Sequence, residues 1–451
     1  MSQSDPNYSL EALPRNGYAV SLFSLCFVFS YLDRQIVSIL VQPLKESLSL
    51  SDTQIGLLQG FAFTICYATA GVVVAQLVDR TNRVRLIGVC VAIWAASTVL
   101  SATAHSFGEL LVYRAGTAVA EAALSPAVLS LFSDMYSPRQ VSRPTSAFML
   151  APYVGSGLAL VGGGLLLDWM AQGSQGILVS SLSLAPWRII FILVGAAGLP
   201  LALLVAFTLR EPKRVENGLV NEGGRGQPTV APPMKSVLKV LLYDKPFCVP
   251  YFLAYTSLIL VFYSFTAWFP TLLIRHFTLA PGVVGNLAGP AYMAGGIVGV
   301  ICARLLIKRA SDEETLEKAL RISTISTTVL VPLTLAASLA PTFHAAAVLY
   351  GVCAFTASIV MALAPIPIQV ALPNRMRGRS IALLVFLTNS IGGGIGPFAV
   401  GFLNQHFPFG LGAALAIVCG IAAAASAVLY FVASNRAARE MSTIVPSSVL
   451  S

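Results

Sequence analysis

The chain has 451 residues, of which 10% are charged and 56% hydrophobic, and its mean hydropathy is +0.79. A soluble domain carries about 25% charged residues, so this composition excludes a soluble enzyme, a disordered chain and a small disulfide scaffold. An integral membrane protein remains, and hydropathy this strong predicts helices rather than a barrel. The net charge of +9 does not indicate nucleic-acid binding, because the basic residues form short clusters between long apolar segments.

Twelve apolar segments are long enough to cross a bilayer, which takes about 20 residues of helix. We therefore predict an all-α membrane protein with twelve transmembrane helices. The spans are expected at 17–40, 53–78, 84–104, 107–135, 143–170, 186–209, 246–274, 281–306, 319–340, 343–370, 376–404 and 409–433.

Lysine and arginine predict how these spans are oriented. If the N-terminus is cytoplasmic, the outer segments hold only Lys45, Arg188 and Arg275, while Arg34 and Arg114 lie inside spans. All other basic residues then fall in inner segments, which is the bias expected of cytoplasmic loops. We expect both termini in the cytoplasm.

The chain divides into two halves around a polar stretch rich in glycine and proline. We expect an N-terminal tail, a six-helix bundle, a cytoplasmic linker, a second six-helix bundle and a C-terminal tail at 1–16, 17–209, 210–245, 246–433 and 434–451. The halves look related, because Pro126 and Pro365 occupy corresponding positions in the fourth and tenth spans. Two pseudo-symmetric bundles joined by a linker are the layout of the major facilitator superfamily.

The loop after the second span resembles the superfamily signature G-x-x-x-D-R-x-x-R, with Ala75 in place of the first glycine. Its charged residues are Asp79, Arg80 and Arg83. An acid at the inner end of a helix can pair with an arginine or a helix N-terminus of the other half. We expect these residues to form a cytoplasmic gate; otherwise they belong to an ordinary positive-inside loop.

Four charged residues lie deep within predicted spans, Asp33 and Arg34 in the first and Arg114 and Glu121 in the fourth. Charges at that depth are costly, so they usually face a cavity or one another. They fit a site for proton coupling and anion recognition, in which Asp33 and Glu121 take up protons. The alternative is a static cluster that holds two helices together.

The predicted spans of the second half contain no carboxylate, but offer aromatic and neutral polar groups. We expect Tyr153, Tyr263, Trp268 and Asn389 to join Arg34 and Arg114 as substrate-binding residues or charge partners. If the charged first half of the chain faces the aromatic second half, the site between them suits a solute that has both a charged and an apolar part. No phosphate-binding loop, hydrolase motif or metal-ligand spacing is found, so we expect neither an enzyme nor a cofactor.

Several motifs of the first half are similar to those of the spinster family of lipid transporters. They are Tyr31-Leu-Asp33-Arg34-Gln35, Gly56-Leu-Leu-Gln59, Asp79-Arg80-Thr-Asn-Arg83, Arg114-Ala-Gly, Val154-Gly-Ser-Gly157 and Arg210-Glu-Pro212. The match is dense over 30–212, whereas the second half agrees only in layout. The resemblance implies a proton-linked carrier of lysophospholipid or sphingosine-phosphate-like amphiphiles, with Asp33 and Glu121 as protonation sites and Arg34 and Arg114 as charge partners or headgroup contacts.

Other functions stay open at this stage. A small organic anion or a drug could use the same charges, and a non-transporting sensor or a lipid-modifying enzyme would need a further domain or catalytic group. We expect a monomer in a bacterial inner membrane whose partners are the bilayer, protons and a small anionic or amphipathic substrate.

Overall fold

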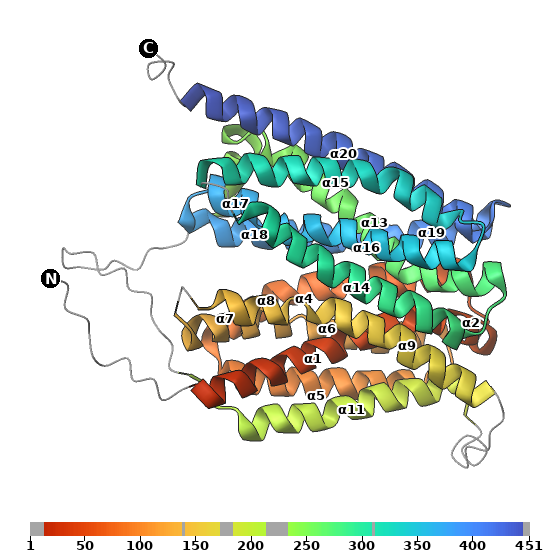
Figure 1. Ribbon diagram of the computed structural model, residues 1–451. Helices are drawn as coiled ribbons and strands as arrows, with labels where there is room; N and C mark the ends of the chain where they lie inside the picture. The colour runs from red at the N-terminus through yellow and green to blue at the C-terminus, as the bar shows by residue number, and fades with distance from the viewer. Residues whose placement is uncertain (1–12, 138–139, 172–183, 213–232, 309–311, 445–451) are drawn as a thin grey trace.

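The structure is a computed structural model that describes residues 13–137, 140–171, 184–212, 233–308 and 312–444. Within this part the chain forms helices and no strand. Twelve of the helical segments are long and apolar enough to cross a membrane, so the prediction of twelve spans is confirmed. Because the spans run side by side, the structure is an elongated bundle (Figure 1).

The first half of the chain forms one bundle, the lower one in Figure 1. Its helices are α1 (Leu13–Ile39), α2 (Val41–Leu48), α3 (Asp52–Gln59), α4 (Phe61–Arg80), α5 (Arg83–Ser101), α6 (Phe107–Glu121), α7 (Leu124–Met135), α8 (Ser142–Phe148), α9 (Ala151–Ala171) and α11 (Pro186–Thr208).

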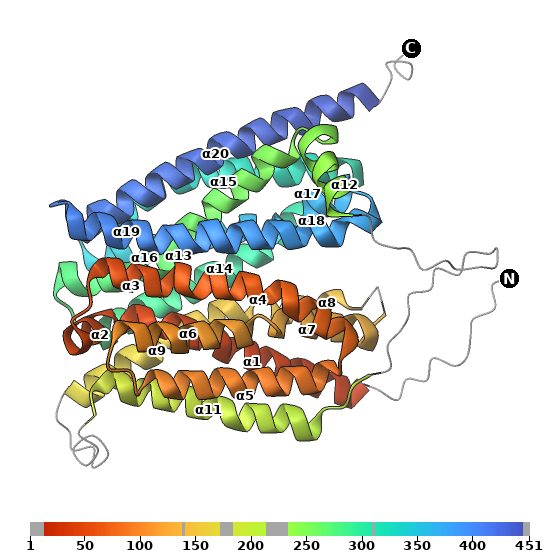
Figure 2. The same cartoon turned by 180° about the vertical axis from the view of Figure 1, so that it is seen from behind.

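The second half forms the other bundle, shown from behind in Figure 2. It comprises α12 (Met234–Lys239), the π-helix η1 (Val240–Asp244), α13 (Cys248–Phe277), α14 (Pro281–Ile307), α15 (Asp312–Ser338), α16 (Phe343–Leu363), α17 (Ile366–Ala371), α18 (Asn374–Leu387), the π-helix η2 (Thr388–Gly393), α19 (Gly394–His406) and α20 (Gly410–Ile444).

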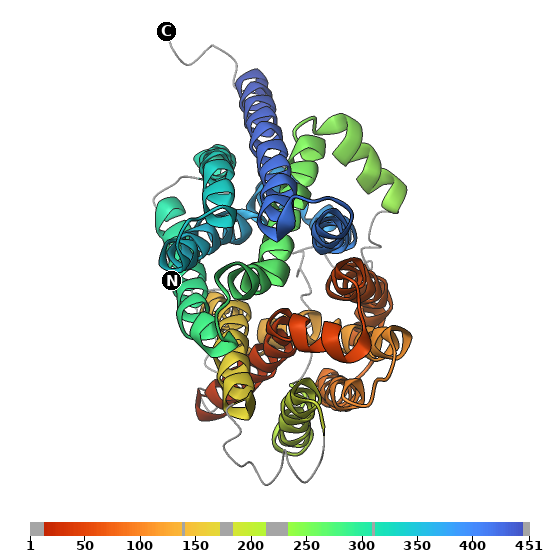
Figure 3. The same ribbon diagram turned by 90° about the vertical axis from the view of Figure 1, so that its right-hand side faces the viewer.

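The first residue of α1 and the last of α20 lie at the same end of the molecule (Figure 1). We name this the inner end, because the lysine and arginine pattern predicts that it faces the cytoplasm. The opposite end, where α2 and α3 meet α19, is the outer end. Seen from there, the two bundles lie one above the other (Figure 3).

Two spans break at equivalent prolines. The fourth span changes from α6 to α7 just before Pro126, and the tenth changes from α16 to α17 at Pro365. A proline ring lacks an amide hydrogen and clashes with the carbonyl four residues earlier, so the helix cannot continue regularly. The break leaves Glu121 as the last residue of α6, where a broken helix can present a functional side chain.

The bundles touch along two close seams, α9 against α14 and α3 against α19. A Cβ atom at Gly285 would lie 2.1 Å from the carbonyl oxygen of Leu160, and one at Gly56 would lie 2.5 Å from that of Pro397. Only glycine therefore lets these backbones come so close. The fifth and eleventh spans therefore lie at the bundle interface.

Two boundaries differ from the sequence-based ones. Helix α20 continues to Ile444 instead of ending at 433, and Glu440 near its end pairs with Lys245. The linker carries a short helix at its C-terminal end, α12, which the sequence analysis did not predict.

Candidate functional site

The four deep charges form two ion pairs between α1 and α6. Arg114 Nη1 lies 2.8 Å from Asp33 Oδ2, and Arg34 Nη2 lies 3.0 Å from Glu121 Oε2. Asp33 and Arg34 are adjacent on α1. Each therefore faces a residue of opposite charge on α6, and these two partners lie two helical turns apart. The structure brings together all four residues that the sequence analysis singled out.

The Asp33–Arg114 pair is enclosed in protein, with side-chain exposures of 0% and 3%. The Trp94 indole also donates to Asp33 Oδ2, over 3.2 Å, and Arg114 reaches the Asp33 backbone carbonyl. Asp33 Oδ1 makes no hydrogen bond to a described residue. Because Arg114 and Trp94 both bind this carboxylate and Arg114 also binds the Asp33 backbone, we regard the pair as the more fixed of the two.

The Arg34–Glu121 pair is more open, since the Arg34 side chain is 14% exposed. The Arg34 guanidinium carbon lies 4.8, 4.3 and 5.0 Å from the ring centres of Tyr31, Phe63 and Tyr67. Cations are attracted to aromatic faces at such distances. Glu121 Oε1 has no hydrogen-bond partner among the described residues. Arg34 therefore lies in an aromatic cage with a single carboxylate as its counter-charge.

Arg34 also contacts the second bundle. Its Nη1 donates to the Tyr263 hydroxyl over 3.3 Å, and that hydroxyl donates to Asn389 Oδ1 over 3.3 Å. Asn389 lies on η2 and is held by its own bond to the Val385 carbonyl. A π-turn within a helix often occurs at a functional site because it redirects side chains. The chain Glu121–Arg34–Tyr263–Asn389 thus spans both bundles.

Two predicted substrate residues lie apart from this chain. Tyr153 packs against Tyr292, with ring centres 6.1 Å apart, and its hydroxyl lies 3.9 Å from the Met361 sulfur. It belongs to an aromatic cluster where α9 meets the second bundle. Trp268 is fully buried within the second bundle, where its indole donates to the Pro397 carbonyl over 2.8 Å.

The predicted gate residues have different surroundings. The side chain of Asp79 lies outside the described part of the structure, and Arg80 is exposed. Arg83 is buried and binds Asp134 and Glu211, each over 2.6 Å. Because all three lie in the first bundle, these contacts tie the inner ends of α5 and α7 to the chain after α11. The cytoplasmic gate stays a prediction.

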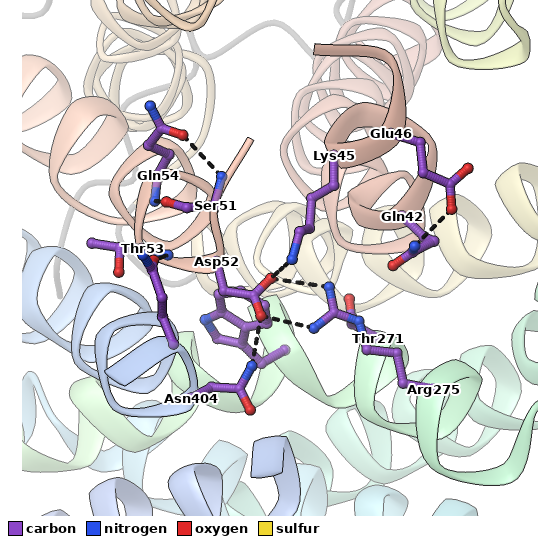
Figure 4. A network of polar contacts seen from close by, with 12 residues as sticks. Gln42, Lys45, Glu46, Ser51, Asp52, Thr53, Gln54, Thr271, Arg275 and Asn404 are labelled. Atoms are coloured by element: carbon purple, nitrogen blue, oxygen red, sulfur yellow. Dashed lines mark hydrogen bonds and ion pairs between the residues drawn. The ribbon is translucent and has the colours of Figure 1, made fainter. Parts of the chain in front are cut away.

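A polar network at the outer end was missed by the sequence analysis (Figure 4). Arg275 of α13 binds both oxygens of Asp52, each over 3.0 Å. Lys45 lies 2.5 Å from Asp52 Oδ1, and Asn404 of α19 donates to Oδ2 over 2.6 Å. Asp52 thus joins the first bundle to two spans of the second.

Local structure fixes Asp52 in place. Ser51 caps α3 by accepting a hydrogen bond from the Gln54 amide, and the Gln54 side chain accepts one from the Ser51 amide. This capping box sets where the helix begins and so directs its first residue toward the second bundle. The Thr53 amide adds a cross-bundle hydrogen bond to Gln405 Oε1 over 3.1 Å. The outer end of the molecule is therefore closed.

Some of the missed residues had a signal in the sequence. Phe63 and Tyr67 are four residues apart, so they share a face of the second span. The sequence analysis placed only three cations in outer segments, and Lys45 and Arg275 are two of them. An acidic partner at the outer end could have been sought for these two residues. Trp94 had no such signal, because the apolar part of its span, residues 86–104, contains no charged residue.

The described residues contain no group of three or more histidine, cysteine, aspartate or glutamate side chains able to hold a metal ion. The chemistry of the site is therefore described by its ion pairs, hydroxyls and aromatic rings.

Known proteins resemble the chain at both the sequence and the structural level. A sequence profile described as Major Facilitator Superfamily matches residues 23–397. An MFS-type efflux pump of Mycolicibacterium smegmatis is 29% identical over 441 residues, which cover 95% of both chains. Protein spinster homolog 1 of Homo sapiens is 27% identical over 255 residues, or 56% of this chain and 45% of that protein.

The fold is similar to a crystal structure of a bacterial homolog to the human lysosomal transporter Spinster, in an inward-facing and occupied conformation. The TM-score is 0.74 at 23% sequence identity, over 94% of this chain and 96% of the other. A D-xylose-proton symporter has a TM-score of 0.65 at 15% identity, over 90% of this chain and 96% of the other. These structural likenesses concern the fold alone.

Proposed function

Because the chain is a spinster-like member of the major facilitator superfamily, a multi-pass membrane transporter and not an enzyme, we propose that it is proton-coupled and carries an anionic amphiphile. We further propose that it works by alternating access in a bacterial inner membrane. The carrier acts as a monomer whose cytoplasmic gate includes Asp79 and Arg80.

The observation that carries this proposal is the position of Arg34. Its guanidinium is shared between Glu121 of the first bundle and Tyr263 of the second, and it keeps 14% of its side chain exposed. An arginine fork can bind a carboxylate or a phosphate through two hydrogen bonds at once. A substrate anion that enters between the bundles would compete with Glu121 for this cation.

The competition between substrate and Glu121 for Arg34 would also explain how a proton is taken up and released. Once Arg34 turns to the substrate, Glu121 keeps no counter-charge within hydrogen-bonding distance, and its side chain is only 2% exposed. A buried carboxylate without a partner costs several kcal/mol, so taking up a proton is the less costly state. When the substrate leaves, Arg34 returns and Glu121 releases the proton. Substrate and proton are thereby coupled through one arginine.

The Asp33–Arg114 pair has a different part in this mechanism. Its exposure is near zero, and Trp94 holds the carboxylate in place. We propose that it fixes α1 against α6, so that neighbouring Arg34 stays aimed at Glu121. Asp33 would then be a positioning residue and, as the other deep carboxylate, the second candidate for proton uptake.

We propose that an apolar part of the substrate lies beside the charged one. Phe262, adjacent to Tyr263 in sequence, lines a small apolar cavity in the second bundle with Phe265, Tyr292 and Tyr350. Aromatic rings of this kind pack well against an acyl chain. The adjacency of one cation and an aromatic wall favours a molecule with an anionic head and an apolar tail.

The test uses purified protein in liposomes that enclose a pH-sensitive dye. Addition of a lysophospholipid or a sphingosine-type phosphate should change the internal pH, and the response should vanish in Glu121→Gln and Arg34→Ala. Glu109→Gln is the matched control, because Glu109 lies on the same helix but is exposed at its outer end. A lipid response that survives in Glu121→Gln would refute the proposed coupling.

A second candidate substrate is a small organic anion. It is favoured by a relative named Probable L-galactonate transporter of Escherichia coli, 26% identical over 198 residues, or 44% of this chain and 40% of that protein. The same liposomes separate the two candidates. A pH response to small sugar acids but not to lipids would assign Arg34 to the smaller anion and leave the aromatic wall as packing.

A further inference from the structure

A short helical segment next to the second bundle has features that the transport mechanism does not use. It comprises α12 and η1, residues 234–244, and leads into α13. It lies at the inner end and runs across the direction of the spans (Figure 2), and it projects sideways from the bundle in the end-on view (Figure 3). A helix in this position lies where the lipid headgroups of the inner leaflet are expected.

One face of this segment attaches it to the protein. Val237 and Leu241, one helical turn apart, are 1% and 4% exposed, and both belong to the main hydrophobic core. Lys245, at the turn into α13, pairs with Glu440 of α20. The segment is therefore docked and is not a free part of the linker.

The other faces are ordered as a membrane-surface helix requires. An apolar row lies next to the buried face, one residue further along the sequence at each turn. It consists of Met234, Leu238 and Leu242, which are 43%, 36% and 52% exposed. A basic row lies next to the apolar row, again one residue further along the sequence. It consists of Lys235 and Lys239, which are both exposed. Since each residue turns a helix by about 100°, the protein-facing, apolar and basic rows succeed one another around the axis.

We propose that residues 234–244 form an interfacial helix that binds anionic phospholipid headgroups of the inner leaflet. The apolar row would insert between acyl chains, while Lys235 and Lys239 face the headgroup phosphates. Neither lysine has an ion pair or hydrogen bond with a described residue, so both ammonium groups are available. The nearest acid in sequence, Asp244, lies about 100° beyond Tyr243 and away from the lysine row.

Electrostatics supports a charged lipid over a neutral one. Each lysine near an anionic surface contributes about 1 kcal/mol of attraction, and the attraction decays within a Debye length. Because the segment leads directly into α13, which carries Tyr263, lipid binding would also hold one end of a span that reaches the Arg34 site.

The test measures lipid retention by native mass spectrometry in an equimolar mixture of phosphatidylglycerol and phosphatidylcholine. Wild type should retain phosphatidylglycerol preferentially. Lys235→Gln with Lys239→Gln should reduce that preference by up to roughly 30-fold, from about 1 kcal/mol per lysine. Lys318→Gln with Arg321→Gln, which removes the same charge from the inner end of α15, should leave it largely unchanged.

Further arms separate a lipid surface from a soluble phosphate. Leu238→Ser with Leu242→Ser should lower retention of both lipids, and free glycerol phosphate should not displace phosphatidylglycerol. The proposal is overturned if the Lys235 and Lys239 variant keeps the preference, if the α15 control loses as much, or if glycerol phosphate competes as well as the lipid. Three of the four substituted cations are exposed and Lys318 is half-buried, so unchanged thermal melting serves as the check that each variant is folded.

Discussion

The outer network gives the sharpest prediction, because one carboxylate joins the two bundles there. Replacing Asp52 by Asn keeps the size of the side chain but removes the charge that binds Arg275 and Lys45. We expect the outer end to open. The Asn404 bond and the glycine seam remain, so the protein should still fold and insert.

The size of the effect follows from the contacts that are weakened. Asp52 accepts two hydrogen bonds from Arg275 across the interface, and hydrogen bonds to charged groups contribute about 1.5–3 kcal/mol each when buried. Arg275 is 24% exposed and can be resolvated, so the contribution is reduced by solvent screening. We expect a loss of about 2 kcal/mol for the closed outer end, or roughly 30-fold in the ratio of closed to open molecules.

The assay is a distance measurement by pulsed electron resonance. Spin labels at positions 105 and 344 report opening in a background with the native cysteines replaced. Both positions are exposed at the outer end, 105 in a loop of the first bundle and 344 at the start of α16 in the second. Glu46→Gln is the matched control, because Glu46 is an outer carboxylate of the first bundle whose side chain binds only Gln42 on its own helix. If Asp52→Asn leaves the distance distribution of the wild type unchanged, or if Glu46→Gln shifts it equally, Asp52 does not hold the outer end closed.

Three further changes test other contacts. Tyr263→Phe removes the hydroxyl that links Arg34 to the second bundle; transport should keep its proton dependence while KM rises several-fold, as seen in concentration series. Gly285→Ala should separate α9 from α14 and lower the melting temperature, whereas Gly162→Ala, which meets nothing within 4 Å, should not. Arg83→Lys should lower stability by about 1.5–3 kcal/mol, because one ammonium keeps the charge but cannot replace a buried fork bound to two acids; an unchanged melting curve would contradict this.

Much of the site could be predicted from sequence because charges inside apolar spans are rare. The free-energy cost of placing a charge inside a membrane indicates that Asp33, Arg34, Arg114 and Glu121 pair with one another. The spacing of Arg114 and Glu121 also puts these two residues on one face of their helix. The pattern could not predict which acid binds which base. That choice depends on the rotation of α1 against α6, and rotation is set by packing against Trp94 and the aromatic cage.

The outer network was missed for a related physical reason. Asp52 lies at the boundary of a predicted span, where an acid is inexpensive and draws no attention. Its importance comes from the capping box that starts α3 and from a fold that brings residues 275 and 404 to the same place. Contacts between residues more than 200 positions apart have no local signature in one sequence. The same holds for Trp268, whose aromatic character indicated binding but whose indole is taken up by a backbone carbonyl.

The two cross-bundle sites are mechanically related because they use the same helices of the second bundle. Helix α13 carries both Tyr263, which binds Arg34, and Arg275, which binds Asp52. The eleventh span carries Asn389 at the first site and Asn404 at the second. A packed helix moves largely as a unit, so separating the bundles at the outer end must also pull Tyr263 away from Arg34. Any substrate anion that stays bound to Arg34 and Tyr263 together therefore favours the closed outer end, because in the empty site these two side chains are joined by a 3.3 Å contact alone.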